Sequence, residues 1–286
     1  MPSDDSRLER AFRIGEEQAK TVLESRRQAR EKKKPSAGVL VAEGDSWFHY
    51  PFHDVLGILE DEFGYDVESV AHWGDRIEEM AYGGGQLDDL ARQIEKVIRA
   101  KRVPKAILLS GGGNDVAGEE FGMLLNHALS PVAGINDAIA RGVIEERVQT
   151  AYVAILAAVT RICEANVGHA IPIVIHGYDR PVPDGRGYAG GWGPMPGPWL
   201  EPGFREKGFL QIPPRIALAG ELIDRFNVML SGIPKLAGLS HVHFLDLRGT
   251  LTTDSHYKDW WANELHPTAQ GFRAVAAKFA SEISSL

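Results

Sequence analysis

Four short polar segments of this chain contain the side chains that could do chemistry. They are Gly44-Asp45-Ser46, His72-Trp73-Gly74-Asp75, Gly111-Gly112-Gly113-Asn114-Asp115 and Asn263-Glu264-Leu265-His266-Pro267. A serine beside a histidine can act as a nucleophile with its general base. Backbone N–H groups and an asparagine amide can stabilise an oxyanion. Acyl transfer would need all of these groups in one place, so the fold must bring the four segments together.

Short apolar runs alternate with helical stretches from Gly38 onward. The apolar runs cover 39–42, 66–71, 106–110, 172–177 and 242–247. The helical candidates lie near 53–63, 86–101, 144–166, 213–231 and 267–283. Apolar strands separated by helices predict a parallel sheet that is covered on both faces. The carboxyl ends of such strands meet at one edge of the sheet, where ligands bind in this class of fold.

The segments also have plainer interpretations when they are taken one at a time. Ser46 could be a helix N-cap, and His266 could cap a helix as well. The glycines 111–113 could form a turn or a phosphate-binding loop, although the Lys-Ser/Thr of a P-loop is missing. A nucleophile, a base and oxyanion donors at one sheet edge together favour catalysis.

In chain order, the four segments resemble the conserved blocks of the SGNH (GDSL-type) hydrolases. Those blocks are Gly-Asp-Ser after the first strand, a glycine after the second, Gly-x-Asn-Asp after the third, and Asp-x-x-His before the last helix. The resemblance spans about residues 38–283. It implies an α/β fold, a three-layer flavodoxin-like sandwich whose five-stranded parallel sheet has the strand order 2-1-3-4-5.

The resemblance also implies a role for each matching residue. Ser46 would be the nucleophile and His266 the general base. The oxyanion hole would consist of the backbone N–H groups of Ser46 and Gly74 and the side-chain amide of Asn114. The implied activity is hydrolysis of small-molecule carboxylic esters by acyl transfer to Ser46, and we expect no cofactor. The ester could be an acyl lipid, a thioester or an acetylated sugar.

The Gly44-Asp45-Ser46 turn makes physical sense for such a site. Glycine permits a sharp turn with room for a carbonyl oxygen. Asp45 is expected to fix the turn by accepting backbone N–H bonds. Ser46 is then expected to start the next helix, whose N-terminus favours the negative charge of a tetrahedral intermediate. Trp47 and Phe48 are expected to anchor the turn in the core, and the alternative is that they line the acyl pocket.

Position 263 departs from the family pattern, because this chain has Asn263 where the family usually has aspartate. An amide can orient the imidazole of His266, but it cannot stabilise the imidazolium by charge. The carboxylates that could supply the charge instead are Glu264, Asp259, Asp254 and Asp246. Three readings stay open: Asn263 orients the ring, another acid does so, or catalysis has been lost.

Two segments interrupt the alternation, near 115–143 and 179–213. The second is rich in proline, glycine and aromatic residues and follows the fourth strand. Aromatic residues are scarce in flexible linkers, so we expect an ordered loop at the ligand-binding edge. Trp192 and Trp199 are the candidate substrate-binding residues of this loop. A surface loop without a role in binding is the plainer alternative.

The chain divides into an N-terminal helical extension, 1–35, and an SGNH hydrolase-like domain, 36–286. Residues 4–33 read as one helix with a narrow apolar stripe, which Pro35-Ser36 ends. The stripe could pack on the rest of the chain, or it could form a homo-oligomer with a second copy. The basic run 26–34 is expected to be a solvated helix end.

Charge and composition narrow the class of protein. The 286 residues carry a formal net charge of −8, of which residues 1–34 contribute +3 and the remainder −11. Such an acidic body disfavours nucleic-acid binding. No apolar run approaches the roughly 18 residues of a membrane span, and no signal peptide is apparent. A single cysteine, Cys163, rules out an internal disulfide. A cytoplasmic protein is expected.

His241 and His243 have strand spacing and would share one face, as two metal ligands do. No third ligand has a recognisable spacing, so no metal site is predicted. Two functions from other classes remain open. One is a non-catalytic binding module with the same fold, and the other is a nucleotide-binding flavodoxin-like protein that uses the Gly111 loop.

Overall fold

The computed structural model describes residues 13, 16–17, 20, 24, 36–188 and 196–286. The chain divides into two compact units, Met1–Ala37 and Gly38–Leu286. Most of the helix expected over 4–33 lies outside the described residues, and so does the oligomer contact expected of it. Trp192 lies outside them too. The layers of sheet and helix belong to the second unit.

A five-stranded sheet forms the centre of this unit, and every neighbouring pair of strands is parallel. Its strands are β1 (Val39–Glu43), β2 (Asp66–Ser69), β3 (Ala106–Leu109), β6 (Ile173–His176) and β7 (Val242–Leu245). The spatial order is β2-β1-β3-β6-β7. This confirms the expected order 2-1-3-4-5. The three central strands are buried along their length, as a sheet covered on both faces requires.

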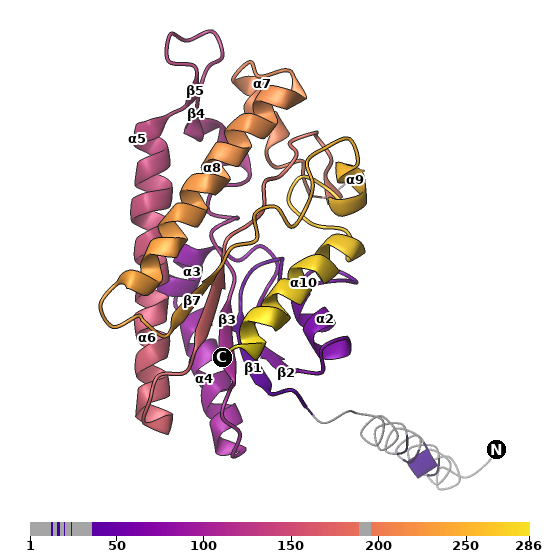
Figure 1. Ribbon diagram of the computed structural model, residues 1–286, viewed down its shortest axis with the longest axis vertical. Helices are drawn as coiled ribbons and strands as arrows, with labels where there is room; N and C mark the ends of the chain where they lie inside the picture. The colour runs from indigo at the N-terminus through magenta and orange to yellow at the C-terminus, as the bar shows by residue number, and fades with distance from the viewer. Residues whose placement is uncertain (1–12, 14–15, 18–19, 21–23, 25–35, 189–195) are drawn as a thin grey trace, which may run out of the picture. The chain divides into compact units, whose positions relative to one another are not determined.

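Helices cover both faces of the sheet (Figure 1). On one face, α2 (Val55–Asp61) packs against α10 (Ala269–Ser284). On the other lie α4 (Gln86–Arg99), α6 (Gln149–Val167) and α8 (Ile212–Gly232), with the short α3 (Ile77–Tyr82) against α6. The flavodoxin-like three-layer sandwich is therefore confirmed.

One helix of the sandwich, Asp137–Val167, is long and apolar enough to cross a membrane by length and composition alone. It comprises α5 (Asp137–Ala140), the π-helical segment η2 (Arg141–Val148) and α6. Tyr152, Leu156 and Val159 of this helix are buried in the core of the unit. Its apolar character is thus explained by packing against the sheet.

The two segments that interrupt the alternation form short elements of their own. After β3 come the 3-10 helix η1 (Glu119–Leu124) and a two-stranded antiparallel hairpin, β4 (Leu125–Asn126) and β5 (Gly134–Ile135). The second segment contains α7 (Glu201–Glu206). Phe121 of η1 meets Phe204 of α7 edge to face, with ring centroids 4.9 Å apart. The two segments therefore pack together, which the sequence did not predict.

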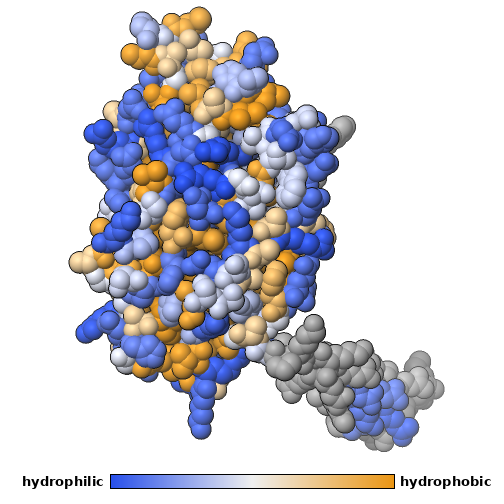
Figure 2. All heavy atoms as spheres, viewed as in Figure 1, coloured by the Kyte–Doolittle hydropathy of each residue, from blue (hydrophilic) through white to orange (hydrophobic). Residues whose placement is uncertain are grey.

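Hydrophobic side chains gather on the surface at the end that holds this hairpin and α7 (Figure 2). The large apolar residues of these segments that are exposed are Met123, Leu129, Val132, Ile139, Leu210 and Ile212. Two further short helices, η4 (Ile233–Lys235) and α9 (Tyr257–Trp260), complete the unit. Elements this short carry too few residues for a periodic pattern.

The expectation that Ser46 starts the next helix is wrong. The backbone N–H groups of Phe48 and His49 both bond to the carbonyl of Asp45, which makes one turn that does not continue. Helix α2 begins at Val55, where the side chain of Asp54 accepts the N–H of Gly57 at 2.7 Å. Pro51 lies between the turn and the helix, and a proline disfavours helical backbone at the residue that precedes it.

Candidate active site

The turn after β1 presents Ser46 at the carboxyl edge of the sheet. At Gly44 the chain comes so close to β3 that a Cβ atom would lie 2.7 Å from the Cβ of Ser110. Glycine is therefore required by close approach at this position. The carboxylate of Asp45 accepts the N–H of Trp47 at 3.0 Å, as expected from the sequence. The indole N–H of Trp47 donates to the carbonyl of Leu265 at 3.1 Å, which ties the turn to the segment before α10.

Three side chains from these two segments form one chain of contacts. The Oγ atom of Ser46 lies 2.7 Å from Nε2 of His266. The Nδ1 atom of the same ring lies 3.0 Å from Oδ1 of Asn263. Ser46 is only 5% exposed and His266 only 2%, so the contacts are shielded from bulk water. A hydroxyl, an imidazole and an amide are thus in the hydrogen-bonding order that a nucleophile, its base and an orienting group would need.

The contacts of Asn263 fix which ring nitrogen of His266 carries the proton. Its Oδ1 atom also accepts the backbone N–H groups of Leu265 and His266, each at 2.9 Å. Its Nδ2 atom donates to the hydroxyl oxygen of Tyr50 at 3.0 Å. Because Oδ1 is an acceptor, Nδ1 of His266 must be the donor. Nε2 then has a free lone pair that faces the hydroxyl of Ser46, which is the tautomer a general base needs.

Aromatic rings enclose the imidazole of His266. Tyr50 stacks on it with ring centroids 4.2 Å apart, and Trp199 meets it edge to face at 5.5 Å. This burial lowers the pKa of His266 from 6.5 to about 3. Sequence reasoning missed Tyr50. It lies four residues after Ser46, in a stretch where no pattern indicated a turn.

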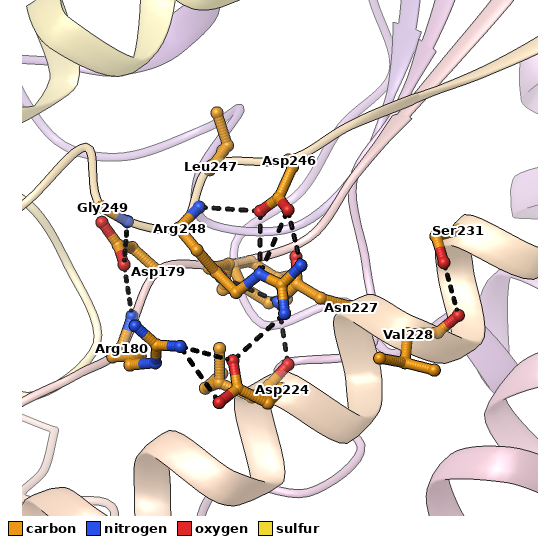
Figure 3. A network of polar contacts seen from close by, with 12 residues as sticks. Asp179, Arg180, Asp224, Asn227, Val228, Ser231, Asp246, Leu247, Arg248 and Gly249 are labelled. Atoms are coloured by element: carbon orange, nitrogen blue, oxygen red, sulfur yellow. Dashed lines mark hydrogen bonds and ion pairs between the residues drawn. The ribbon is translucent and has the colours of Figure 1, made fainter.

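None of the four carboxylates considered as substitutes for the triad aspartate has a described contact with His266. Glu264 accepts four backbone N–H groups, those of Gly185, Trp199, Leu200 and Glu201. Asp246 pairs with Arg248 at 2.6 Å, and Arg248 also holds the pKa of that carboxyl below its usual value (Figure 3). Asp254 and Asp259 are exposed. Asn263 is therefore the group that faces Nδ1 in the described structure.

Glu264 has a different use, which is to order the aromatic loop. Its two carboxylate oxygens hold the backbone of the loop on both sides of the segment 189–195. One of these bonds fixes Trp199, whose ring then lies against His266. The structure thus places Trp199 beside the imidazole, and its role as a substrate-binding residue stays a prediction.

Candidate oxyanion donors lie around Ser46. Asn114 lines the same cavity as Ser46, and its Nδ2 atom donates to the carbonyl of Asp75 at 2.9 Å. That bond joins the loop after β3 to the loop that contains Gly74. The φ angle of Gly74 is +89°, which favours glycine. Among the described contacts, the backbone N–H groups of Ser46 and Gly74 donate to no acceptor, but Gly74 is not among the residues that line the cavity beside Ser46. The oxyanion hole of Ser46, Gly74 and Asn114 stays a prediction.

The glycines 111–113 serve packing. A Cβ atom at Gly111 would lie 2.9 Å from the side chain of Ile77, and one at Gly112 would lie 2.7 Å from the ring of Phe226. At Gly113 the ring of Tyr178 would be 3.2 Å away. The loop is therefore filled against apolar side chains. This argues against an open cradle for a phosphate group.

No protein-family model and no curated protein matches this sequence. A protein from Slackia heliotrinireducens described as an SGNH hydrolase matches the structure with a TM-score of 0.48 and 14% identity, over 86% of this chain and 98% of the other. An acetylxylan esterase from Geobacillus stearothermophilus matches with 0.44 and 16%, over 88% and 96%. A family 3 carbohydrate esterase from Talaromyces cellulolyticus matches with 0.41 and 13%, over 87% and 99%. The chain is similar in fold to SGNH hydrolases.

A buried polar network lies beneath the turn that holds Ser46, and sequence reasoning missed it. Asp45 accepts a hydrogen bond from the hydroxyl of Tyr178. The hydroxyl of Ser110 lies 2.8 Å from Asp45 and 2.8 Å from Nε2 of His176. The other ring nitrogen of His176 bonds to the carbonyl of Gly177 at 2.9 Å. The network links the ends of β1, β3 and β6, so it holds the turn of Ser46 against the sheet.

Glu43, the last residue of β1, is also buried beside the site, with 2% of its surface exposed. Its Oε1 atom accepts the N–H of Gly44 at 2.9 Å, and Oε2 has no hydrogen-bond partner. Burial raises the pKa of Glu43 from 4.5 to about 8. The carboxyl group is therefore protonated at neutral pH.

The two histidines considered as metal ligands have other neighbours. His241 lies 2.8 Å from the hydroxyl of Thr160, and His243 lies 3.4 Å from Glu282. Within the part of the chain that the structure describes, no group of three His, Cys, Asp or Glu side chains could hold a metal ion. Cys163 is buried within α6.

Proposed function

We propose that this protein is a serine hydrolase that cleaves carboxylic esters by acyl transfer to Ser46. The observation that supports it most is the ordered contact of Ser46 Oγ with His266 Nε2 at 2.7 Å and of His266 Nδ1 with Asn263 at 3.0 Å. The tautomer fixed by Asn263 leaves a base facing the hydroxyl proton. An isolated serine or histidine at a sheet edge would not require this arrangement.

In the acylation step, Ser46 Oγ attacks the carbonyl carbon of the ester and its proton passes to Nε2 of His266. The oxygen of the tetrahedral intermediate is placed near the N–H groups of Ser46 and Gly74 and the amide of Asn114. When the intermediate collapses, the alcohol leaves with the proton from His266. The acyl group stays on Ser46.

Deacylation repeats these steps with water as the nucleophile. His266 takes a proton from water, the oxygen of water attacks the acyl carbon, and the carboxylic acid leaves as Ser46 recovers its proton. Because Asn263 is neutral, the imidazolium that forms in each step has no adjacent carboxylate to stabilise it. The proposed enzyme is therefore slower than one with an aspartate at this position.

The test combines labelling and turnover. A fluorophosphonate should label the wild-type protein at Ser46, and 4-nitrophenyl esters should be hydrolysed. Ser46→Ala should abolish both, and His266→Ala should remove nearly all turnover, with losses that are far from additive in the double mutant. Circular dichroism of each variant checks that the fold is intact.

Wild-type turnover in Ser46→Ala would refute the proposal. So would a folded wild-type protein that neither reacts with the label nor hydrolyses any ester, which would favour a non-catalytic binding module.

A further inference from the structure

A cavity of about 90 Å³ opens beside Ser46 and Asn114. Part of its apolar wall comes from the loop after β3, with Val116, Ala117 and Phe121, and part from α8, with Ala219, Leu222 and Ile223. Trp47, Leu200 and Trp261 from other segments also line it. Asp45 and Asp179 also line it, but both carboxylates already accept hydrogen bonds from protein groups. Away from its mouth, the cavity therefore offers apolar contact and few polar partners to a ligand.

A second, smaller void of about 40 Å³ lies behind the first. The two voids share five residues in their walls, which are Gly113, Val116, Tyr178, Leu222 and Ile223. The far side of the second void is closed by Ile144 of η2 and Phe226 of α8. Four side chains, including that of Tyr178, thus lie between the cavity at Ser46 and the additional apolar space.

Ion pairs fix α8, the helix that forms one wall of the cavity (Figure 3). Asp224 of α8 pairs with Arg180 at 2.9 Å and with Arg248 at 3.1 Å. Arg180 follows β6 and Arg248 follows β7, and Arg248 also pairs with Asp246. These contacts join α8 to the segments that follow two strands of the sheet.

A row of aromatic rings lies outside the cavity. The ring of Tyr50, which stacks on His266, has its centroid 5.8 Å from that of Tyr188. Tyr188 in turn lies 6.0 Å from Trp73, which is 47% exposed. The alcohol part of an ester must leave after acylation, whereas the acyl part stays on Ser46. The partly exposed aromatic side suits the leaving group, and the enclosed apolar cavity suits the acyl chain.

We propose that the cavity is an acyl-chain site, and that the preferred substrates are esters of unbranched acids of about four to six carbons. This rests on the proposed function of Ser46. A cavity of roughly 150 Å³ accommodates benzene, so one carbon needs about 25 Å³. The 90 Å³ beside Ser46 then holds roughly four carbons beyond the carbonyl. An acetyl group would leave most of it empty, and a chain of ten carbons would not fit.

The first measurement is kcat/KM for 4-nitrophenyl esters from acetate to decanoate. Each methylene that enters the cavity should raise kcat/KM about fourfold, until the optimum is reached at about four to six carbons. Longer chains should react more slowly. A series in which acetate is the best substrate, or in which chain length has no effect, overturns the acyl-chain site.

Variants of α8 test where the acyl chain of the substrate binds. Leu222→Ala should join the two voids and move the optimum roughly three to four carbons longer. Ala219→Leu should fill the cavity and move the optimum to acetate or propionate. Leu230→Ala is the matched control for the first, because Leu230 is buried on α8 but lines neither void. Ala217→Leu, on the exposed side of α8, is the control for the second.

Two further comparisons keep the test decisive. Ile223→Ala should lengthen the optimum as Leu222→Ala does, and it replaces that variant if Leu222→Ala does not fold.

A second series varies the alcohol at a fixed butyryl group, and the chain length of the alcohol should have little effect. An optimum that follows the alcohol instead overturns the assignment. If fluorophosphonate labels Ser46 but chain preference is unchanged in every variant, the acyl-chain site is wrong and the proposed function stands. Absence of both labelling and turnover refutes the proposed function itself.

Discussion

Tyr50 stacks on the imidazole of His266 and its hydroxyl oxygen accepts a hydrogen bond from the amide of Asn263. One residue therefore contacts both the proposed base and the group that orients it. Burial raises the pKa of Tyr50 to about 12, so its hydroxyl stays protonated through the working range of pH. The orientation of the Asn263 amide is fixed by the backbone N–H groups of Leu265 and His266, which both donate to its Oδ1 atom, and the hydroxyl of Tyr50 accepts from the Nδ2 atom that remains.

Tyr50→Phe should therefore lower kcat with little change in KM. The substitution keeps the ring on His266 and removes only the partner of the Asn263 amide, so a loss of about fivefold is expected from one hydrogen bond. Tyr50→Leu removes the stacking as well and should cost more. Steady-state kinetics on the preferred ester separate kcat from KM. A change confined to KM would make Tyr50 a substrate-binding residue.

The strand order was implied by the resemblance of the four segments to the SGNH blocks. The alternation of apolar runs with helical stretches predicted the parallel sheet at whose edge Ser46, Asn263 and His266 meet. Apolar runs of four or more residues marked the strands, and the ends of parallel strands converge whatever their connecting loops do. Their catalytic roles remain predictions. Tyr50 and the Asp45–Ser110–His176 network could not be found in this way, because their contacts depend on how side chains pack within the turn and beneath the sheet.

The cavity beside Ser46 could not be predicted from the sequence for a related reason. Its walls combine one face of α8 with a loop that contains η1, and the packing of η1 on α7 depends on contacts far apart in sequence. Glu264 was weighed as a catalytic acid because it stands next to Asn263. Its four backbone donors come from a loop more than sixty residues away, and no local pattern reports them.

In the wild-type protein, the pH below which kcat/KM falls should be unusually low. The pKa of His266 is lowered to about 3, so the neutral base persists as pH falls through 6.5, where an ordinary histidine becomes protonated. We expect kcat/KM at pH 5 to stay close to its value at pH 7. Circular dichroism at each pH separates loss of the base from unfolding. A tenfold loss per pH unit below 6.5 would show that the imidazole is not shielded.

Asn263→Asp should raise the pH below which kcat/KM falls. A carboxylate beside Nδ1 stabilises the imidazolium, which raises the pKa of His266 and also the rate of the proton transfers. The hydroxyl of Tyr50 can rotate to donate to the new carboxylate, so the site can accept the change. We expect higher kcat at pH 8 and a steeper loss of kcat/KM between pH 7 and 5 than in the wild type. A variant that is slower at every pH, combined with a large loss in Glu264→Gln, would contradict the orienting role of Asn263.

Asn114→Ala should lower kcat by roughly 10²–10³, the usual cost of one oxyanion donor. Part of the loss could come from the bond between its amide and Asp75, which positions the loop of Gly74. Asn114→Leu is the matched variant, because it keeps the approximate size of the side chain, adds no charge and removes both N–H donors. Equal losses in the two variants, with KM nearly unchanged, are the expected result. A loss seen only in KM would indicate a ground-state contact with the substrate.

The free energy of unfolding of Glu43→Gln should exceed that of the wild type by an amount that grows as pH rises. The folded-state pKa of Glu43, about 8, lies above its unfolded value of 4.5, so its contribution to stability is fully present below pH 4.5 and is lost as pH rises towards 8. Over that window the wild type should lose up to about 1.4 kcal/mol per pH unit relative to the variant, whose amide is neutral throughout. Urea denaturation of both proteins at pH 5, 6, 7 and 8 measures the difference in the free energy of unfolding. Glu145→Gln, which replaces an exposed glutamate, reports the effect of removing one negative charge from the surface. A difference between Glu43→Gln and wild type that does not grow with pH would mean that the carboxyl of Glu43 is already ionised when folded, and that its unpartnered Oε2 atom has access to water.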